Sequence, residues 1–249
     1  MWRVALLGMM AAATAWAREP KQGAGGEEGG VIEPKADQAL HKMSDFLSKQ
    51  RSFQVETTSV DEKYTRDGQK VQELQSSTVT VQRPAQIRVD RVSPRGHSLF
   101  RDDGKQLSLY NQERKLYATA PAPSSIDAAV DEVREKLHVD APGGDLIVSD
   151  PYRDLTEGTV SGRYVGLEPI DGQMAHHLFF TKKDVDWQIW IKDGPEPVPL
   201  RYVITDKDAP SQPQFTLELH DWQPSVQVSK DYFTFTPPPG AKKLEPNRQ

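Results

Sequence analysis

The residues with the clearest potential for chemistry are six histidines, of which only His176 and His177 are adjacent. Neighbouring side chains in a strand point to opposite faces, so this pair cannot chelate one metal ion by itself. The sequence has no His-Glu-x-x-His or Gly-x-Ser-x-Gly motif and no cysteine. A catalytic site whose residues meet only in the folded protein would show no characteristic motif in the sequence. A hydrolase that uses His176 or His177 therefore remains a hypothesis, beside the two given at the end of this subsection. We expect no metal, no cofactor and no enzymatic activity.

The composition is that of a globular protein. The chain has 249 residues, 36% hydrophobic and 27% charged, with a formal net charge of −5. One large domain is enough for a chain of this length. Because the chain has no basic excess, we expect no binding to nucleic acid.

The first 17 residues have the features of a signal peptide. Arg3 supplies a positive charge, residues 4–13 are apolar, and Ala15-Trp16-Ala17 has the small-x-small pattern of a cleavage site. The apolar run is shorter than the ~20 residues that a membrane span needs. We therefore predict a signal peptide over 1–17 and a periplasmic protein with no integral membrane span after cleavage.

Residues 18–32 contain five glycines around Glu27 and Glu28. Such a segment is too polar and flexible to fold by burial, which predicts a tether over 18–32. Its glycine spacing lacks the lysine and hydroxyl residue that end a phosphate-binding loop. We expect the rest of the chain, 33–249, to form a single domain.

Two segments have the periodicity of amphipathic helices. In 34–50 the apolar residues recur every three or four positions, and Pro34 suits a first helical turn. In 124–137 the same spacing follows Ser124 or Ser125, either of which could be the N-cap.

Eleven segments have the pattern of strands separated by turns such as Asp67-Gly68 and Asp171-Gly172. Successive hairpins predict antiparallel meanders, and with two helices they indicate an α+β fold. The sheet could close into a barrel or curl around the helices as an open half-barrel. The predicted strands are 53–64, 69–81, 86–93, 97–101, 106–110, 115–119, 159–167, 173–181, 185–191, 200–205 and 214–222.

Alternation predicts one apolar and one polar face for this sheet. In 185–191 every second residue is apolar, while Asp186 and Gln188 lie on the opposite side. The helices must then cover the apolar face. Trp190 falls on the polar side, where it is either an isolated surface aromatic or a contact for a partner.

Two stretches carry a family resemblance. The first runs from Met43 to Tyr117 and includes Val81-Gln82-Arg83-Pro84 and Arg101-Asp102-Asp103-Gly104-Lys105; the second is the C-terminal stretch from Tyr232 to Ala241. Their order resembles the LolA-like superfamily, the periplasmic carriers of outer-membrane lipoproteins. Within it, the block from Trp187 to Ile191 followed by Pro199-Leu200-Arg201 is most similar to a family described as predicted periplasmic proteins.

The resemblance implies an incomplete, half-open antiparallel β-barrel of about eleven strands covered by helices, with an apolar cavity for acyl chains. It also implies a role for Arg83. In the carriers, an arginine directly before the corresponding proline hydrogen-bonds the helical lid, so Arg83 is the candidate lid latch. The other interpretation is a surface arginine beside a turn proline. The chain is longer than the carriers between Ile147 and Asp184.

We therefore expect a non-enzymatic carrier that binds a lipid, a lipoprotein or another amphiphile between sheet and helices. Its partner would be a lipid or an acylated protein, and the carrier would be a monomer. The alternative is a module with a packed core that binds or senses another envelope protein. The residues predicted to line the ligand site are the apolar-face residues of the strands, and a register error of one residue would exchange them for those of the opposite face. They are Leu107, Leu109, Leu116, Leu178, Phe180, Trp187, Ile189, Leu200, Tyr202, Phe215 and Leu217.

Overall fold

The computed structural model describes residues 31–137 and 142–244, except the side chains of residues 133–137. The predicted signal peptide and residues 18–30 of the predicted tether lie outside the described residues. The last two residues of that tether, Val31 and Ile32, form the first strand.

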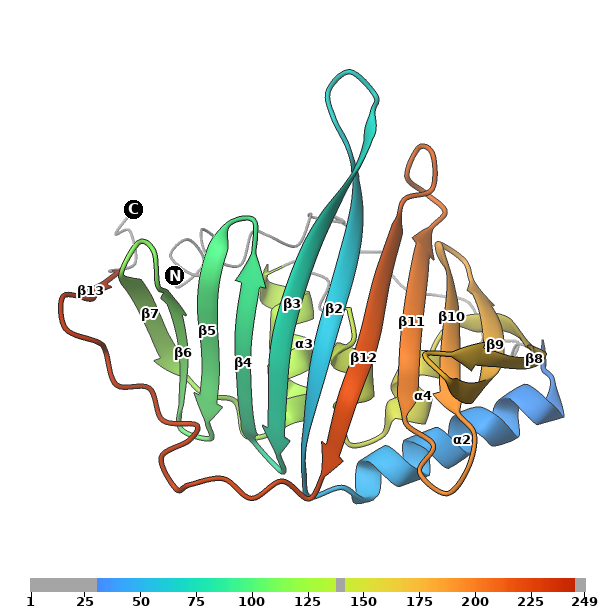
Figure 1. Cartoon of the computed structure of the whole chain (residues 1–249), viewed down its shortest axis with the longest axis horizontal. Coiled ribbons are helices and arrows are strands. Elements are labelled where there is room, and N and C mark those ends of the chain that lie inside the picture. The colour runs from blue at the N-terminus through green and yellow to red at the C-terminus, as the bar shows by residue number, and fades with distance from the viewer. Residues whose placement is uncertain (1–30, 138–141, 245–249) are drawn as a thin grey trace.

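Within the described part of the chain, thirteen strands form one sheet (Figure 1). The eleven predicted strands are all present, and two short strands, β1 and β13, extend the sheet. The strands are β1 (Val31–Ile32), β2 (Ser52–Tyr64), β3 (Lys70–Gln82), β4 (Gln86–Ser93), β5 (Gly96–Asp103), β6 (Gln106–Asn111), β7 (Leu116–Pro121), β8 (Thr159–Ile170), β9 (Gln173–Lys182), β10 (Val185–Lys192), β11 (Pro199–Asp206), β12 (Gln214–Pro224) and β13 (Lys242–Lys243).

The sheet consists of two antiparallel meanders, β2 to β7 and β8 to β12, joined where β12 pairs with β2. Phe215 of β12 lies opposite Asp61 of β2. The short strands β1 and β13 are parallel to β8 and β7 and stand at the two ends of the strand order. The two ends are not paired with each other, so the sheet is an open half-barrel, as predicted.

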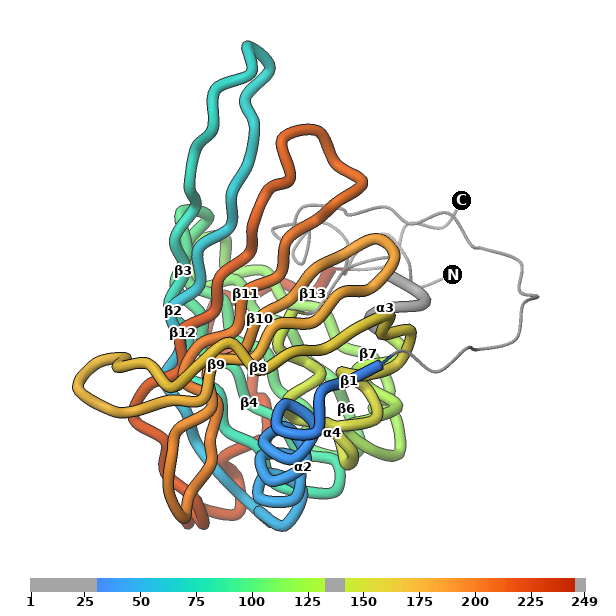
Figure 2. Tube along the Cα trace, turned by 90° about the vertical axis from the view of Figure 1, so that its right-hand side faces the viewer, coloured from blue at the N-terminus to red at the C-terminus, as the bar shows by residue number. Residues whose placement is uncertain are grey.

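All helices lie on one side of the sheet, which Figure 2 shows edge-on. Pro34 occupies the first turn of α2, and the Ser125 hydroxyl accepts a hydrogen bond from the Ala128 amide (3.1 Å) ahead of α3. Both helix starts were predicted. The helical elements are α2 (Pro34–Lys49), α3 (Ile126–Leu137), the 3-10 turn η1 (Gly144–Leu146) and α4 (Pro151–Thr156).

The core lies between the concave face of the sheet and these helices. The predicted alternation is confirmed in β10, where Trp187, Ile189 and Ile191 are buried and the residues between them are only partly buried. Trp187 stacks on Phe180 of β9, with ring centroids 4.0 Å apart. Each such side chain contributes about 1.5–3 kcal/mol by burial. The helical face that covers them includes Ala36, Leu40, Met43 and Leu47 of α2 and Leu155 of α4.

The C-terminal strap, residues 225–244, leaves the end of β12, follows the lower edge of the first meander in Figure 1 and reaches β13 at the end of the sheet. Arg88 donates to the Tyr232 carbonyl (3.3 Å), and Phe233 is 2% exposed. Phe235 contacts the rings of Tyr110 and Tyr117, at centroid distances of 5.8 and 5.4 Å. The strap ends in β13, which pairs with β7. It therefore ties the last part of the chain to the first meander.

Candidate functional site

Most of the predicted lining residues meet in one place. Seven belong to the buried core between β9 to β12 and the helices, and Phe215 is partly buried against them. Trp187 lies opposite Ile204 and Ile189 opposite Tyr202, so the apolar residues of β10 and β11 share one face of the sheet. These side chains pack against one another in a single buried cluster. The seven are Leu178, Phe180, Trp187, Ile189, Leu200, Tyr202 and Leu217.

The other three predicted lining residues lie apart, in the first meander. Leu109 is buried outside that core, and Leu107 and Leu116 are only partly buried. The pairing of Leu109 with Phe100 and Ala118 puts its side chain on the concave face. The concave face is therefore filled over the second meander and more accessible over β6 and β7.

Arg83 connects the sheet to the helices. It follows β3, and its Nε donates to the Gln50 carbonyl at the end of α2 (3.2 Å). Its Nη1 donates to the Ile147 carbonyl (2.8 Å), in the helical connection, residues 126–156, between β7 and β8. Burial lowers the pKa of this guanidinium, although the Asp127 carboxylate acts in the opposite direction. Arg83 thus joins α2, the connection and the sheet.

Further polar contacts join the helical connection to α2. The Tyr152 amide donates to the Ser44 hydroxyl (2.9 Å), and the Tyr152 hydroxyl donates to Asp37 on α2 (2.6 Å). Burial and this bond to a carboxylate raise the pKa of Tyr152 to about 12. The ring also stacks on His41, at 3.5 Å between centroids. These residues are far apart in sequence, and nothing in their spacing indicates that they meet.

A second set of contacts ties the connection to itself and to β11. Asp127 accepts hydrogen bonds from the amide and the hydroxyl of Ser149. The Tyr202 hydroxyl donates to Asp145, at 3.3 Å. Tyr202 is thus both a core residue and an anchor for η1, which its apolar-face position did not predict.

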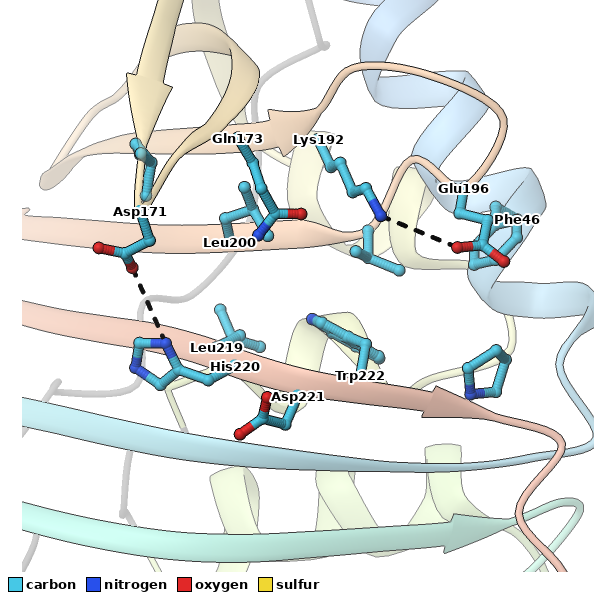
Figure 3. Close-up of a pocket in the computed structure, with 13 residues that line it drawn as sticks. Phe46, Asp171, Gln173, Lys192, Glu196, Leu200, Leu219, His220, Asp221 and Trp222 are labelled. Atoms are coloured by element: carbon cyan, nitrogen blue, oxygen red, sulfur yellow. Dashed lines mark ion pairs between the residues drawn. The ribbon is translucent and has the colours of Figure 1, made fainter.

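An open pocket of about 410 Å³ lies beside the end of α2 (Figure 3). Its apolar lining includes Phe46, Leu200, Leu219 and Trp222, and two weak ion pairs border it. The Lys192 and Glu196 charges are 3.8 Å apart, and those of His220 and Asp171 are 3.9 Å apart. Among the predicted lining residues only Leu200 borders this pocket. The sequence analysis missed it because the β8–β9 turn, the β10–β11 loop and β12 meet only in the fold.

His176 and His177 face opposite ways, as predicted. His176 lies between the Tyr164 hydroxyl (2.9 Å) and Asp193 (3.1 Å). His177 lies between Glu168 (3.0 Å) and Gln188 (3.0 Å). In the described residues no group of three or more histidine, aspartate or glutamate side chains is placed to hold a metal ion.

Trp190 is not an isolated surface aromatic. It is partly buried and stacks on His177, with centroids 4.0 Å apart, while its Nε1 donates to Glu168 (2.9 Å). The Arg201 guanidinium lies 5.5 Å from its ring centroid. The sequence could not predict this arrangement, because Glu168 reaches Trp190 across β9.

A family model described as "Predicted periplasmic protein (DUF2092)" matches residues 36–245. No match was found among curated proteins. Among solved structures, the lipoprotein LppX of Mycobacterium tuberculosis is 15% identical, with 79% of this chain and 100% of that chain covered and a TM-score of 0.51. LprF from Mycobacterium bovis is 16% identical, with coverage of 80% and 98% and a TM-score of 0.48. A LolA superfamily protein from Nitrosomonas europaea is 15% identical, with coverage of 80% and 97% and a TM-score of 0.40.

In the described ranges we find no helix with both the length and the apolar content needed to cross a membrane.

Proposed function

Because the chain belongs to the DUF2092 family of predicted periplasmic proteins, with a LolA-like fold, we propose that it is a non-enzymatic periplasmic carrier of a lipid or acylated protein. The acyl chain would enter between the concave face of the sheet and the helical connection. The ligand-contacting residues proposed are the eleven predicted lining residues.

The observation that carries this proposal is the position of Arg83. Its hydrogen bond to the Ile147 carbonyl holds the helical connection over an apolar face, and its bond to the Gln50 carbonyl ties the same side chain to the end of α2. A typical hydrogen bond from a charged donor contributes about 1.5–3 kcal/mol, so these contacts can break and re-form. Arg83 would then act as the latch between a closed state and an open, ligand-accepting state.

The energetics favour an acyl ligand over a polar one. Burying each methylene contributes ~0.8 kcal/mol, so a chain of ~14 methylenes gains roughly 11 kcal/mol before the costs of binding. That gain can offset the displacement of Leu146 and Val148, which the connection inserts into the core. The partly buried Leu107 and Leu116 mark the side where a chain would first find apolar surface.

The first test is native mass spectrometry of protein purified from periplasm without detergent, with organic extraction of anything bound. The proposal expects a lipid in stoichiometric amount, or uptake of added fatty acid or phospholipid by empty protein. Protein that is empty and refuses both classes would overturn it.

A charge placed on the accessible part of the concave face should block uptake. Leu116→Glu puts a carboxylate where the acyl chain would pass, and we expect at least a tenfold loss of fatty-acid binding by fluorescence titration. Val92→Glu is the matched control, because Val92 is 57% exposed and pairs with Ser76 of β3, away from the concave face. Equal binding by both folded variants would argue against an acyl site there.

A second candidate is binding to an envelope protein. Exposed apolar side chains gather where β1, β8 and β9 form one end of the sheet, including Val165, Leu167 and Met174 at 43–47% exposure. Such patches often mark interaction surfaces. Trp190→Ala tests the outer-face contact first considered from the sequence, and Leu167→Ser tests the edge. Cross-linking in periplasm that is unchanged by both would remove this candidate.

A further inference from the structure

A second pocket, of about 100 Å³, lies between the first half of α2 and the loop that follows β10. Lys35, Gln38 and Lys42 line it from one face of the helix, at spacings of three and four residues. The opposite wall includes His176 and Asp193. None of the eleven residues proposed for the acyl site borders this pocket, so its role does not depend on the carrier proposal.

The pocket is basic although the whole chain is acidic. Lys35, Lys42 and Lys192 contribute three positive charges, against one carboxylate among the lining residues, that of Asp193. That carboxylate already lies 3.1 Å from the His176 imidazole. Within the described part of the chain, Lys35 and Lys42 have no ion-pair partner, and the Lys35 ammonium sits 3.7 Å from the centroid of the Tyr164 ring. The charges of Lys35 and Lys42 are therefore available to a ligand, whereas Lys192 lies 3.8 Å from the Glu196 carboxylate.

The surroundings of the pocket hold its groups in place. The Tyr164 hydroxyl, the His176 ring and Asp193 form a chain of contacts of 2.9 and 3.1 Å. The Asp193 amide donates to the Met174 carbonyl (2.8 Å), which fixes the start of the loop. Glu33, the nearest acidic residue before α2, accepts a hydrogen bond from the Tyr164 amide. The first turn of α2 adds the positive end of a helix dipole.

We propose that this basic pocket binds a phosphate group. Its volume of about 100 Å³ suits a small tetrahedral anion. Lysine ammonium groups bind phosphate as point charges, and the Gln38 side-chain amide adds a neutral donor beside them. The phosphate belongs either to a lipid head group or to a free phosphate ester.

The basic pocket and the larger pocket of about 410 Å³ share one lining residue, Lys192. The two possible phosphate ligands would therefore occupy the pockets differently. A phosphate-bearing amphiphile would place its head in the basic pocket and its chain against Leu200, Leu219 and Trp222. A free phosphate ester would occupy the basic pocket alone.

The test titrates the mature chain with sn-glycerol 3-phosphate, dodecyl phosphate and the uncharged dodecyl maltoside, by calorimetry and amide chemical shifts. We expect both phosphate probes to shift the Asp193 and Gly194 amide signals. The double variant Lys35→Gln/Lys42→Gln should bind both probes at least tenfold more weakly. Lys49→Gln is the matched control, because Lys49 lies seven residues beyond Lys42, about 10 Å along the same face. All three lysines are exposed, so folding should survive.

If dodecyl phosphate binds at least tenfold more tightly than glycerol 3-phosphate and also shifts the Trp222 indole, the source is a lipid head group. Equal affinities assign a free phosphate ester. Equal weakening by the lysine double variant and by Lys49→Gln, or unmoved Asp193 and Gly194 amides, would overturn the proposal. Loss of dodecyl phosphate binding in Leu116→Glu but not in the lysine double variant would assign that binding to the concave face instead.

Discussion

Asp102 is a carboxyl group in an unfavourable environment. It is fully buried at the end of β5; its Oδ1 accepts from the Gly104 amide (2.8 Å), and its Oδ2 has no hydrogen-bond partner. Burial raises the pKa of Asp102 to about 6. The folded state therefore binds this proton more tightly than the unfolded state, in which the pKa is near 4.

Asp102 makes the stability of the fold depend on pH. The ionised form opposes folding above about pH 6, and the penalty disappears as the pH falls from about 6 to 4. The rise of the Asp102 pKa to about 6 on folding corresponds to a free-energy penalty of roughly 3 kcal/mol for the ionised form. The free energy of unfolding of the wild-type protein should therefore rise as the pH falls from about 6 to 4. We expect Asp102→Asn to abolish this rise, measured by urea denaturation between pH 4 and 8.

Asp45→Asn provides the comparison, because Asp45 is exposed on α2. It should keep the pH profile of the wild-type protein. Parallel profiles for wild type and Asp102→Asn would mean that Asp102 is not the group responsible.

Some residue-level features follow from sequence and others do not. The burial of Trp187 and Ile189 follows from alternation, which depends only on local geometry. The partners of Trp190 do not, because a register shift between Tyr164 and Gly166 in β8 decides where Glu168 points. The latch role of Arg83 came from family resemblance, and the bonds to Gln50 and Ile147 are consistent with that prediction without testing it.

Among the elements, the C-terminal strap stabilises the sheet from outside. Phe233 is its most buried side chain, and Tyr232 packs edge-on against it, with centroids 5.3 Å apart. Truncating a buried phenylalanine to alanine costs about 3–5 kcal/mol. We expect Phe233→Ala to lower the free energy of unfolding by about that amount, measured by chemical denaturation.

Phe235→Ala is the paired variant, because Phe235 is only partly buried. It should cost clearly less. If the two variants are equally stable, the strap does not pack on the sheet in solution as described.

The long elements were predictable because periodicity needs several residues to show itself. All eleven long strands and both long helices begin and end within a few residues of their predicted bounds. The helix α4 has only six residues, too few for a helical pattern of apolar residues to be recognised in the sequence. Its start is set by Asp150, whose side chain accepts a hydrogen bond from the Arg153 amide (3.1 Å). The two-residue strands β1 and β13 exist only because β8 and β7 lie beside them.

At the scale of the whole molecule, we expect the sheet and its helical cover to differ in local stability. The β2–β3 pair is continuous over thirteen residue pairs. The helices α3 and α4 have 12 and 6 residues, lengths that are marginal without tertiary contacts. We expect backbone amides in α3 and α4 to exchange with solvent faster than those of β2 and β3, by local opening.

Arg83→Ala should enlarge this difference. Losing its bonds to Gln50 and Ile147 removes about 2 kcal/mol, which speeds exchange in α3 and α4 by roughly 30-fold and leaves β2 and β3 unchanged. Arg163→Ala removes an equal charge from β8 and should have no such effect. A uniform acceleration across the molecule would show that Arg83 stabilises the whole fold rather than a latch.

The pairing of β12 with β2 also has a consequence for biogenesis. The first and second meanders join only when β12 reaches β2, and the Ser52 hydroxyl bonds to the Val226 carbonyl 174 residues further along the chain. A periplasmic protein emerges from the export channel N-terminus first, so β2 to β7 stand alone until the end of the chain arrives. During that interval β2 is an open edge beside uncovered apolar surface, the state most prone to aggregate. The speed of translocation, rather than final stability, would then limit the yield of native protein, and chaperones that shield exposed strands would raise it.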